Sequence, residues 1–214
     1  MPFEDRADAA GRLAGRLMKF KGDPGAMVAA LPRGGVVIGR IVADALGLPL
    51  DLVVPRKIGA QGDPEYAIGA VTEEGDAVWN EKERGKADPA YLDDELERQR
   101  TEARRRLGTY RAGLPERSFE GKKVLLVDDG AATGLTMRAA LATVRRGKAA
   151  LVVVALPVCP PDTAKELAAD ADDVIVLEEP AFFMSIGGFY EEFPQVEDDE
   201  VLMAMKGKSE KKKA

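Results

Sequence analysis

Apolar and polar positions along this chain alternate in blocks typical of strands and helices that follow one another. Short apolar, β-branched runs predict strands, and apolar positions spaced three or four residues apart predict helices. We expect strands at 26–31, 50–54, 67–71, 77–79, 124–127, 149–156 and 173–177, and helices at 5–20, 34–46, 88–111, 137–141 and 161–168. The strands at 67–71 and 77–79 form a candidate hairpin, and 59–64 is expected to be a loop. This alternation predicts an α/β fold with a mainly parallel central sheet flanked by helices.

The segment 124–136, with the sequence VLLVDDGAATGLT, is the most informative part of the chain. Its four apolar residues indicate a strand buried on both faces, and two carboxylates, Asp128 and Asp129, follow at the carboxyl end. Small residues and then a helix come next. Because ligands of open parallel sheets bind outside the carboxyl ends of the strands, the two acids stand at the expected site of chemistry.

The loop after the acids is suited to an anion. The hydroxyls of Thr133 and Thr136 and the unpaired N–H groups at the start of the next helix can surround a phosphate. Asp128 and Asp129 repel a phosphate, so they must face hydroxyl groups or a hydrated cation on the same ligand. A phosphorylated sugar supplies both halves.

This segment resembles the ribose-5-phosphate loop of the type I phosphoribosyltransferases, in which four apolar residues and two acids precede Thr-Gly-x-Thr. The resemblance implies that Asp128 and Asp129 bind the 2- and 3-hydroxyls of phosphoribosyl pyrophosphate (PRPP). It implies that the 5-phosphate is bound by Gly130, Ala131, Ala132, Thr133, Gly134, Leu135 and Thr136. Ala132 stands where the oxopurine enzymes carry an Asp that interacts with the purine ring, which argues against hypoxanthine or guanine. Leu135 stands where many members have glycine.

A second turn, Leu31-Pro32-Arg33-Gly34-Gly35, follows the first predicted strand of the sheet. An arginine at the start of a helix is a suitable clamp for an anion, and a plain strand–helix turn is the alternative. The turn resembles the pyrophosphate loop of the same family, which implies that Arg33, Gly34 and Gly35 hold the leaving group. Members of the family often have a cis peptide bond before the basic residue, so the resemblance directs attention to Pro32–Arg33.

Two further stretches have counterparts in the family. Arg56 and Lys57 stand where the family has the start of a mobile loop that closes over pyrophosphate; the alternative is a basic pair in solvent. Phe189 and Tyr190 belong to an aromatic-rich stretch where a variable hood binds the nitrogenous acceptor, and a flat base can stack on such rings. A small core beneath a loop explains these rings equally well. The sequence leaves open whether Glu65 orients a cation or lies in solvent.

Two other interpretations of the paired acids are weaker. Asp and Thr are good helix N-caps, but a cap needs neither two acids nor Thr-Gly-x-Thr. A phosphorelay receiver domain also has paired acids after its first strand, and it needs a third Asp at the carboxyl end of a later strand. Asp173 begins the run 174–177 instead of ending it, so it falls on the wrong edge of the predicted sheet.

The composition narrows the chemistry. The 214 residues contain no histidine and one cysteine, which excludes Ser-His catalysis, internal disulfides and cysteine-cluster zinc sites. Cys159 is expected to be a buried apolar residue. We expect Mg²⁺, carried by PRPP and water near Asp128 and Asp129, with no direct protein ligand. No apolar run is long enough to cross a membrane and no signal peptide is visible, so we expect a cytoplasmic protein.

Charge and length limit the partners and the domain organisation. The net charge is −6, and the segment 206–214 carries five lysines and one glutamate, so about −10 falls on the remainder. An acidic body does not favour nucleic acid as a partner. We expect one domain at 1–205, with a hood from 180–200 and the N-terminal region, and a disordered tail at 206–214.

The resemblance implies a Mg²⁺-dependent enzyme that transfers ribose-5-phosphate from PRPP to a small nitrogenous acceptor. Its catalytic residues would be Asp128, Asp129, Arg33, Arg56 and Lys57, and we expect it to form a homodimer. A non-catalytic PRPP-sensing regulatory protein on the same fold is the alternative. The sequence does not identify the acceptor.

Overall fold

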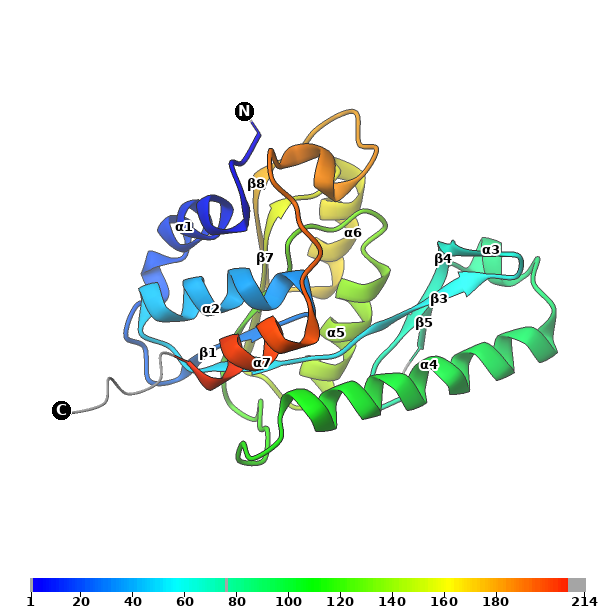
Figure 1. Ribbon diagram of the computed structural model, residues 1–214, viewed down its shortest axis with the longest axis horizontal. Coiled ribbons are helices and arrows are strands. Elements are labelled where there is room, and N and C mark those ends of the chain that lie inside the picture. Colours follow the sequence, from blue (N-terminus) through cyan, green and yellow to red (C-terminus); the bar gives the residue numbers. More distant parts are fainter. Residues whose placement is uncertain (1, 76, 208–214) are drawn as a thin grey trace.

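A five-stranded parallel sheet in the order β2-β1-β6-β7-β8 lies at the centre of the computed structural model, which describes residues 2–75 and 77–207 (Figure 1). Its strands are β1 (Ala26–Ala30), β2 (Leu50–Leu52), β6 (Lys123–Val127), β7 (Leu151–Val158) and β8 (Asp173–Glu178). The helices that flank it are α1 (Arg6–Arg16), α2 (Gly34–Leu46), α5 (Leu135–Arg146) and α6 (Pro161–Asp170). The predicted fold class is confirmed.

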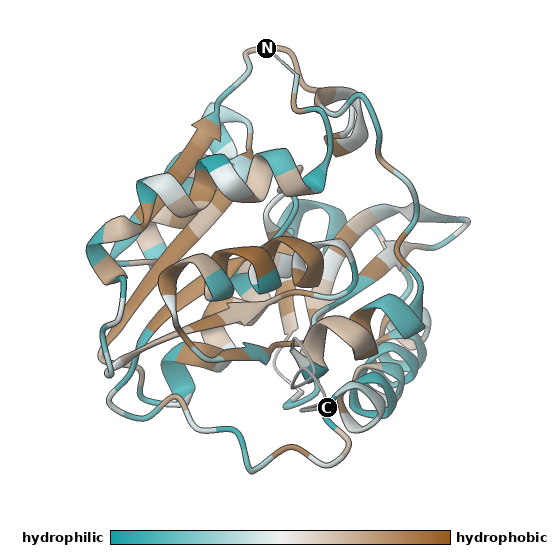
Figure 2. Ribbon diagram, turned by 60° about the vertical axis from the view of Figure 1, so that its left-hand side comes forward, coloured by the Kyte–Doolittle hydropathy of each residue, from teal (hydrophilic) through white to brown (hydrophobic). Residues whose placement is uncertain are grey.

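Alternate residues of these strands enter two separate hydrophobic cores, because successive side chains of a strand point to opposite faces of the sheet. On one face, Leu125 and Val153 pack with residues of α1 and α2. On the other face, Leu126 and Val154 pack with residues of α5 and α6. Figure 2 shows the strands as a hydrophobic layer between the helices. Burial on both faces explains why the strand runs are apolar throughout.

The direction in which the chain adds strands reverses between β1 and β6. From β1 the chain continues through α2 to β2 at one end of the sheet, and from β6 it continues through α5 to β7 toward the other end. The starts of α2 and α5 therefore follow the carboxyl ends of two adjacent strands. Open α/β sheets bind their ligands at such a topological switch point.

A three-stranded antiparallel sheet, β3 (Arg56–Ala60), β4 (Asp63–Val71) and β5 (Ala77–Trp79), extends away from the central sheet (Figure 1). The predicted hairpin between β4 and β5 is confirmed. The predicted loop at 59–64 is wrong, because the ends of β3 and β4 occupy it and leave only a tight turn at 61–62. Packing compensates for the weak strand propensity here: Ile58 and Ile68 are buried against Leu92 of α4 (Pro89–Tyr110).

Most predicted helices are present, with some changes in their ends. The long charged helix is α4, and Asp88 is its N-cap as the sequence indicates. The predicted helix at 5–20 is shorter, because α1 ends at Arg16 and a 3-10 turn, Met18–Phe20, follows it. Two helices have no counterpart in the prediction, the short α3 (Glu81–Arg84) and α7 (Asp198–Lys206). Helix α7 is held by tertiary contacts, since Val201 and Met205 pack with Tyr110.

The beginning of the chain lies beside the stretch that precedes α7. Phe3 forms a β-bridge with Tyr190, and the Phe3 N–H donates to the carbonyl of Phe189 at 2.8 Å. A 3-10 turn, Ile186–Phe189, leads into this pairing. Lys206 ends α7, and the rest of the predicted tail beyond 207 lies outside the described residues. Within residues 2–75 and 77–207, no helix is long and apolar enough to cross a membrane.

Gly39 sets how closely α2 packs on β1, because a Cβ atom there would lie 2.7 Å from the Cβ of Ala30. We predict that Gly39→Ala lowers the free energy of unfolding by about 1–3 kcal/mol, since overpacking exceeds the gain in helix propensity. Gly11→Ala in α1 is the control, because no neighbouring atom lies within 4 Å of its Cβ position. It should raise stability by up to about 1 kcal/mol. Urea denaturation measures both variants, and similar changes in the two would contradict the close packing of α2.

Candidate functional site

The two acids after β6 lie directly against the start of α2. A Cβ atom added to Gly34 would collide with the carboxylate of Asp129, and one added to Gly35 would lie 2.8 Å from the Cα of Asp128. Only residues without a side chain allow this approach. The structure thus brings together the two predicted loops, which are far apart in the sequence.

Asp129 is held by residues from both ends of the chain. Its Oδ2 accepts a hydrogen bond from Arg6 Nε at 2.9 Å, and both side chains of this ion pair are largely buried. Arg6 also donates to the carbonyl of Pro194 at 2.7 Å, and its guanidinium lies 3.7 Å from the centre of the Phe193 ring. The Tyr190 hydroxyl donates to the backbone carbonyl of Asp129 at 2.7 Å. Asp129 is therefore fixed in position, with one oxygen already engaged.

The two neighbouring carboxylates differ in their electrostatic support. Burial and then the charge of Asp129 raise the pKa of Asp128 well above its ordinary value. Burial also raises the pKa of Asp129, while Arg6 acts in the opposite direction. The ion pair with Arg6 therefore favours ionisation of Asp129 over that of Asp128. Asp128 is the carboxyl that gains most from a ligand that brings hydroxyl donors or positive charge.

The turn from β6 into α5 is held by hydrogen bonds to neighbouring elements, while the start of α5 has no side-chain cap from the described residues. The Ala131 N–H donates to the carbonyl of Val158 at 3.0 Å, and the Thr163 hydroxyl donates to the carbonyl of Ala132 at 2.8 Å. Gly134 precedes the helix with a φ of 70°, and no side chain within 2–75 and 77–207 caps the first turn. The backbone N–H groups in the first turn of α5 lack intrahelical partners and lie at the positive end of the helix dipole, which suits a phosphate.

The residues of this turn have different roles. Thr133 is exposed and Thr136 is half-buried, so both are placed at or near the surface of the loop. Leu135 is buried with Ala139, and it can offer a ligand only its backbone N–H. Gly130 fits closely, because a Cβ atom there would lie 2.8 Å from Ile186.

The turn at Arg33 forms a second open helix start. The peptide bond between Pro32 and Arg33 is cis, as the resemblance suggests. Arg33 is the N-cap residue of α2, and no described side chain caps that helix either. Its Nη1 lies 3.4 Å from Glu197 Oε2 and 3.5 Å from Asp198 Oδ1. Two uncapped helix N-termini therefore flank the acid pair.

Arg56 and Lys57 begin β3, so the predicted start of a loop is a strand. The Arg56 side chain turns toward α4, where its Nε donates to Gln99 Oε1 at 2.9 Å. Burial and then the charge of Arg106 lower the pKa of Arg56, so its positive charge is poorly compensated. Lys57 is half-buried and lies opposite Ala70 in the antiparallel pairing.

The two aromatic candidates for stacking are partly covered. The Tyr190 ring is buried, with the centres of the Phe3 and Phe193 rings at 5.3 and 4.8 Å. It therefore belongs to a small core beneath the loop, and this corrects the interpretation of Tyr190 as a surface for a base. Burial also raises its pKa, which keeps the hydroxyl a donor to Asp129. Phe189 is half-buried and stacks on Phe183 with 5.4 Å between ring centres.

A model of the phosphoribosyl transferase domain matches residues 4–193. The chain belongs to the phosphoribosyl transferase family. Two curated Mycobacterium tuberculosis proteins, named "Putative phosphoribosyl transferase MT0597" and "Putative phosphoribosyl transferase Rv0571c", are each 41% identical over 202 residues. The match covers 94% of this chain and 45% of theirs, so the chain spans about half the length of these relatives. The crystal structure of TT1426 from Thermus thermophilus has 42% identity and a TM-score of 0.79, covering 96% of this chain and 98% of that one.

The sequence analysis did not identify three residues around this candidate site, namely Arg6, Tyr110 and Asp198. Arg6 is four residues before Ala10 and seven before Leu13, so it lies on the apolar face of α1. A charged residue on an apolar helix face indicates a buried ion pair, so the sequence does contain a signal for Arg6. Tyr110 and Asp198 gave no such signal, because their contact depends on α7.

The acid pair fits a metal ion that arrives with a ligand. Carboxylate oxygens suit a hard cation such as Mg²⁺. Across the described residues, no group of three or more His, Cys, Asp or Glu side chains is placed to hold a metal ion, and Arg6 already engages Asp129. The oxygen donors of the pair are thus of a type that fits Mg²⁺, and Asp128 is the carboxyl that Arg6 does not engage.

Asp173 and Cys159 do not take part in the candidate site. Asp173 begins β8 at the amino edge of the sheet and pairs with Lys19 at 3.0 Å, so it cannot complete a receiver-type acid cluster. Cys159 is buried, and burial raises its pKa to about 12. It is a packing residue, as predicted, and not a nucleophile.

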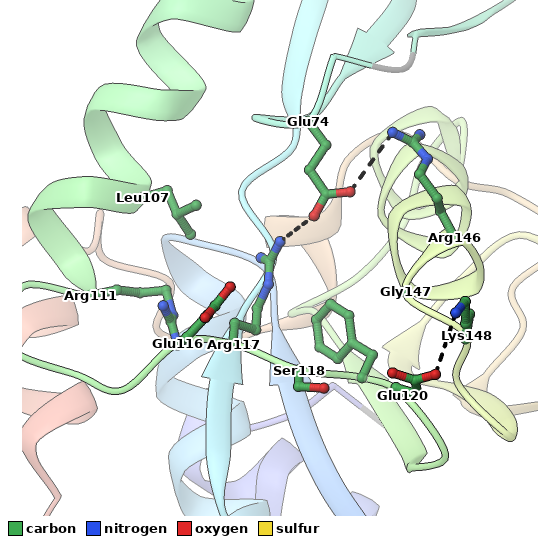
Figure 3. A pocket seen from close by; sticks show the side chains of 11 residues that line it. Glu74, Leu107, Arg111, Glu116, Arg117, Ser118, Glu120, Arg146, Gly147 and Lys148 are labelled. Atoms are coloured by element: carbon green, nitrogen blue, oxygen red, sulfur yellow. Dashed lines mark hydrogen bonds and ion pairs between the residues drawn. The ribbon is translucent and has the colours of Figure 1, made fainter.

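The cavity in Figure 3, about 460 Å³ in volume, lies away from the acid pair. Part of its lining, 119–120 and 147–148, precedes β6 and β7, which places it at the opposite edge of the sheet. Its charges pair with one another, as Glu74 lies between Arg117 and Arg146. A different cavity, about 600 Å³, borders the turn from β6 into α5 and is lined by Ala132, Thr133, Trp79, Arg138 and others.

Loss of Arg6 should destabilise the fold strongly, because it leaves the largely buried Asp129 without its cation. We predict that Arg6→Gln lowers the free energy of unfolding by about 3–5 kcal/mol. Arg12→Gln, on the same helix, removes an exposed ion pair with Asp8 and should change stability by less than about 0.5 kcal/mol. Chemical denaturation at neutral pH compares them. Equal losses of unfolding free energy in the two variants would show that the buried Arg6–Asp129 pair contributes no more to stability than the exposed pair.

Replacing the ionisable carboxyl of Asp128 with an amide should stabilise the ligand-free protein. A raised folded-state pKa means that wild type loses stability as pH rises through and above the ordinary pKa of an aspartate. Asp128→Asn avoids this loss and should raise the free energy of unfolding on the order of 1 kcal/mol at pH 7.5, with a smaller gain at pH 5. Denaturation at both pH values measures the difference, and a variant less stable than wild type at pH 7.5 would contradict the raised pKa.

Proposed function

We propose that this protein transfers the ribose-5-phosphate of PRPP to a nitrogenous acceptor and releases pyrophosphate. The observation that carries the proposal is the arrangement of two uncapped helix N-termini around one acid pair. A ligand with two anionic groups and a diol between them matches this arrangement. PRPP has this form, with pyrophosphate at one end and the 5-phosphate at the other.

Each part of the ligand has a partner in this proposal. The first turn of α5, with Thr133 and Thr136, binds the 5-phosphate, and the ribose diol donates hydrogen bonds to Asp128 and Asp129. The pyrophosphate lies at the start of α2 beside Arg33. Each charge-assisted hydrogen bond contributes about 1.5–3 kcal/mol, so several together give substantial affinity.

The reaction is a displacement at the anomeric carbon of the ribose. The acceptor nitrogen forms a bond to this carbon as the carbon–oxygen bond to pyrophosphate breaks, and the electron pair leaves with the pyrophosphate. Arg33 and the N–H groups of α2 stabilise the charge that develops on the leaving group. Mg²⁺, when bound, adds positive charge on the pyrophosphate. The acids favour the oxocarbenium-like character of the ribose and hold it in place.

The β3–β4 hairpin has a covering role in the proposal. Arg56 and Lys57 stand at its base, and the charge of Arg56 is poorly compensated without a ligand. An anion in reach of Arg56 relieves this. Closure over the bound pyrophosphate excludes water, which otherwise competes with the acceptor as a nucleophile.

The acceptor is proposed to be a base other than hypoxanthine or guanine. Ala132 has no group that can interact with the ring of an oxopurine, and it borders the cavity of about 600 Å³ that Trp79 also lines. Phe189, which is half-buried, stays a candidate for contact with the acceptor. We also propose that the protein acts as a cytoplasmic homodimer without a nucleic-acid or membrane partner; light scattering checks the oligomeric state.

Asp128→Asn should lower turnover at least about 100-fold, because an amide cannot supply the negative charge that bound hydroxyl donors and a cation favour on Asp128. The assay follows pyrophosphate release from PRPP with Mg²⁺ and a panel of bases. Asp173→Asn is the matched control, since it changes an aspartate at the opposite edge of the sheet and should keep wild-type turnover.

The assay has two outcomes that contradict the proposal. Wild-type turnover in Asp128→Asn would remove the role of the acid pair. Tight binding of PRPP by the wild type without pyrophosphate release on any base would favour the PRPP-sensing alternative. Calorimetric titration with PRPP alone separates binding from turnover.

A further inference from the structure

We propose that Asp198, held by Tyr110, positions the guanidinium of Arg33 for the pyrophosphate group of the substrate. Helix α7 would then be part of the substrate-binding machinery, although its residues lie beyond both predicted loops. The inference rests on the proposed function for the identity of the anion. It concerns a positioning residue, because Asp198 acts through Arg33 and need not touch the substrate.

The three side chains form a short chain of polar contacts. The Tyr110 hydroxyl donates to Asp198 Oδ1 at 2.7 Å, and the same oxygen lies 3.5 Å from Arg33 Nη1. The contact between Tyr110 and Asp198 is thus a short hydrogen bond, while the contact between Asp198 and Arg33 is longer. The guanidinium has five N–H donors, so its remaining donors stay available for an anion.

The first member of this series of contacts, Tyr110, is held in a packed hydrophobic core. Tyr110 is 2% exposed and shares a hydrophobic cluster with Val36 of α2 and with Val201 and Met205 of α7. The cluster joins the end of α4, the first turns of α2 and the apolar face of α7. A side chain held by packing on three helices is a suitable support for a binding residue.

The charges of the contact favour a fixed carboxylate. The hydrogen bond from Tyr110 and then the charges of Arg106 and Arg33 lower the pKa of Asp198, apart from the opposing effect of burial. Burial and the bond to Asp198 raise the pKa of Tyr110 to about 12, so the hydroxyl keeps its proton. Asp198 is therefore ionised and oriented near neutral pH.

Glu197 has a different role from Asp198. Its side chain is 64% exposed, against 43% for Asp198, and it forms a capping box with Glu200 at the start of α7. Its carboxylate lies 3.4 Å from Arg33, but an exposed pair of this kind contributes little. The hydrogen bond from Tyr110 singles out Asp198 as the oriented partner.

A competing arrangement makes the opposite prediction. If the carboxylates of α7 occupied Arg33 in place of the substrate anion, their removal would increase affinity. If Asp198 positions Arg33, its removal decreases affinity, because Arg33 then samples more rotamers before binding. The sign of the change decides between the two.

The test compares Asp198→Asn and Tyr110→Phe with Asp199→Asn as the matched control. Asp199 is the next residue in the first turn of α7 and is exposed. Titration with Mg²⁺·PRPP and with inorganic pyrophosphate should give dissociation constants raised about fivefold in the first two variants and unchanged in the control. In turnover assays kcat/KM should fall in the first two variants, because Arg33 also stabilises the charge that develops on the leaving group, and it should stay at the wild-type value in the control. Unchanged or lower dissociation constants in Asp198→Asn would overturn the proposal.

A second measurement keeps the inference separate from the proposed function. The NMR signal of the Arg33 Nε–H group, assigned by its loss in Arg33→Lys, reports the order of this side chain without any ligand. We expect a more mobile Arg33 in Asp198→Asn and Tyr110→Phe, and wild-type order in Asp199→Asn. Absence of PRPP binding by the wild type would refute the proposed function alone. Unchanged Arg33 order in both test variants would refute the positioning role alone.

Discussion

Two carboxylates in a place with little water are the constraint on which the rest of this site depends. Ionised oxygens removed from water are costly unless positive groups or hydrogen-bond donors compensate them. Asp129 has such support in the ligand-free protein from Arg6. Asp128 accepts a hydrogen bond from the backbone N–H of Asp129 at 2.8 Å, but burial and the charge of Asp129 outweigh this support and raise its pKa. The electrostatic need of Asp128 is thus complementary to a ligand that carries hydroxyls and a cation.

Backbone N–H groups at two helix starts supply partial positive charge beside the acid pair. The reversal of strand order between β1 and β6 places the starts of α2 and α5 beside each other at the carboxyl edge of the sheet. Both helix starts lack a side-chain cap from the described residues, so their N–H groups are open to anions. Gly34 and Gly35 let one of these helices approach the acids closely. An acid pair between two uncapped helix starts is the arrangement on which the proposed binding of PRPP rests.

The two ends of the described chain contribute opposite charges to this arrangement. Helix α1 brings Arg6 to the acid, and helix α7 brings Asp198 to the base at Arg33. The candidate site residues at the sheet edge are thereby contacted by elements that lie outside the motifs. The motifs alone are therefore insufficient to build such a site, because rotamers at its centre depend on packing at its periphery.

The sequence by itself determined the order of strands and helices, the parallel sheet and the loops at its carboxyl edge. Apolar strand runs, the Asp88-Pro89 helix start and the paired acids depend on local patterns, and these are visible residue by residue. Tertiary structure alone decided the strands at 59–64, the burial of Tyr190, the Arg6–Asp129 pair and the contact of Asp198 with Arg33. Each of these depends on contacts between residues far apart in the chain, whose energies override local propensity and leave little trace in the neighbouring sequence.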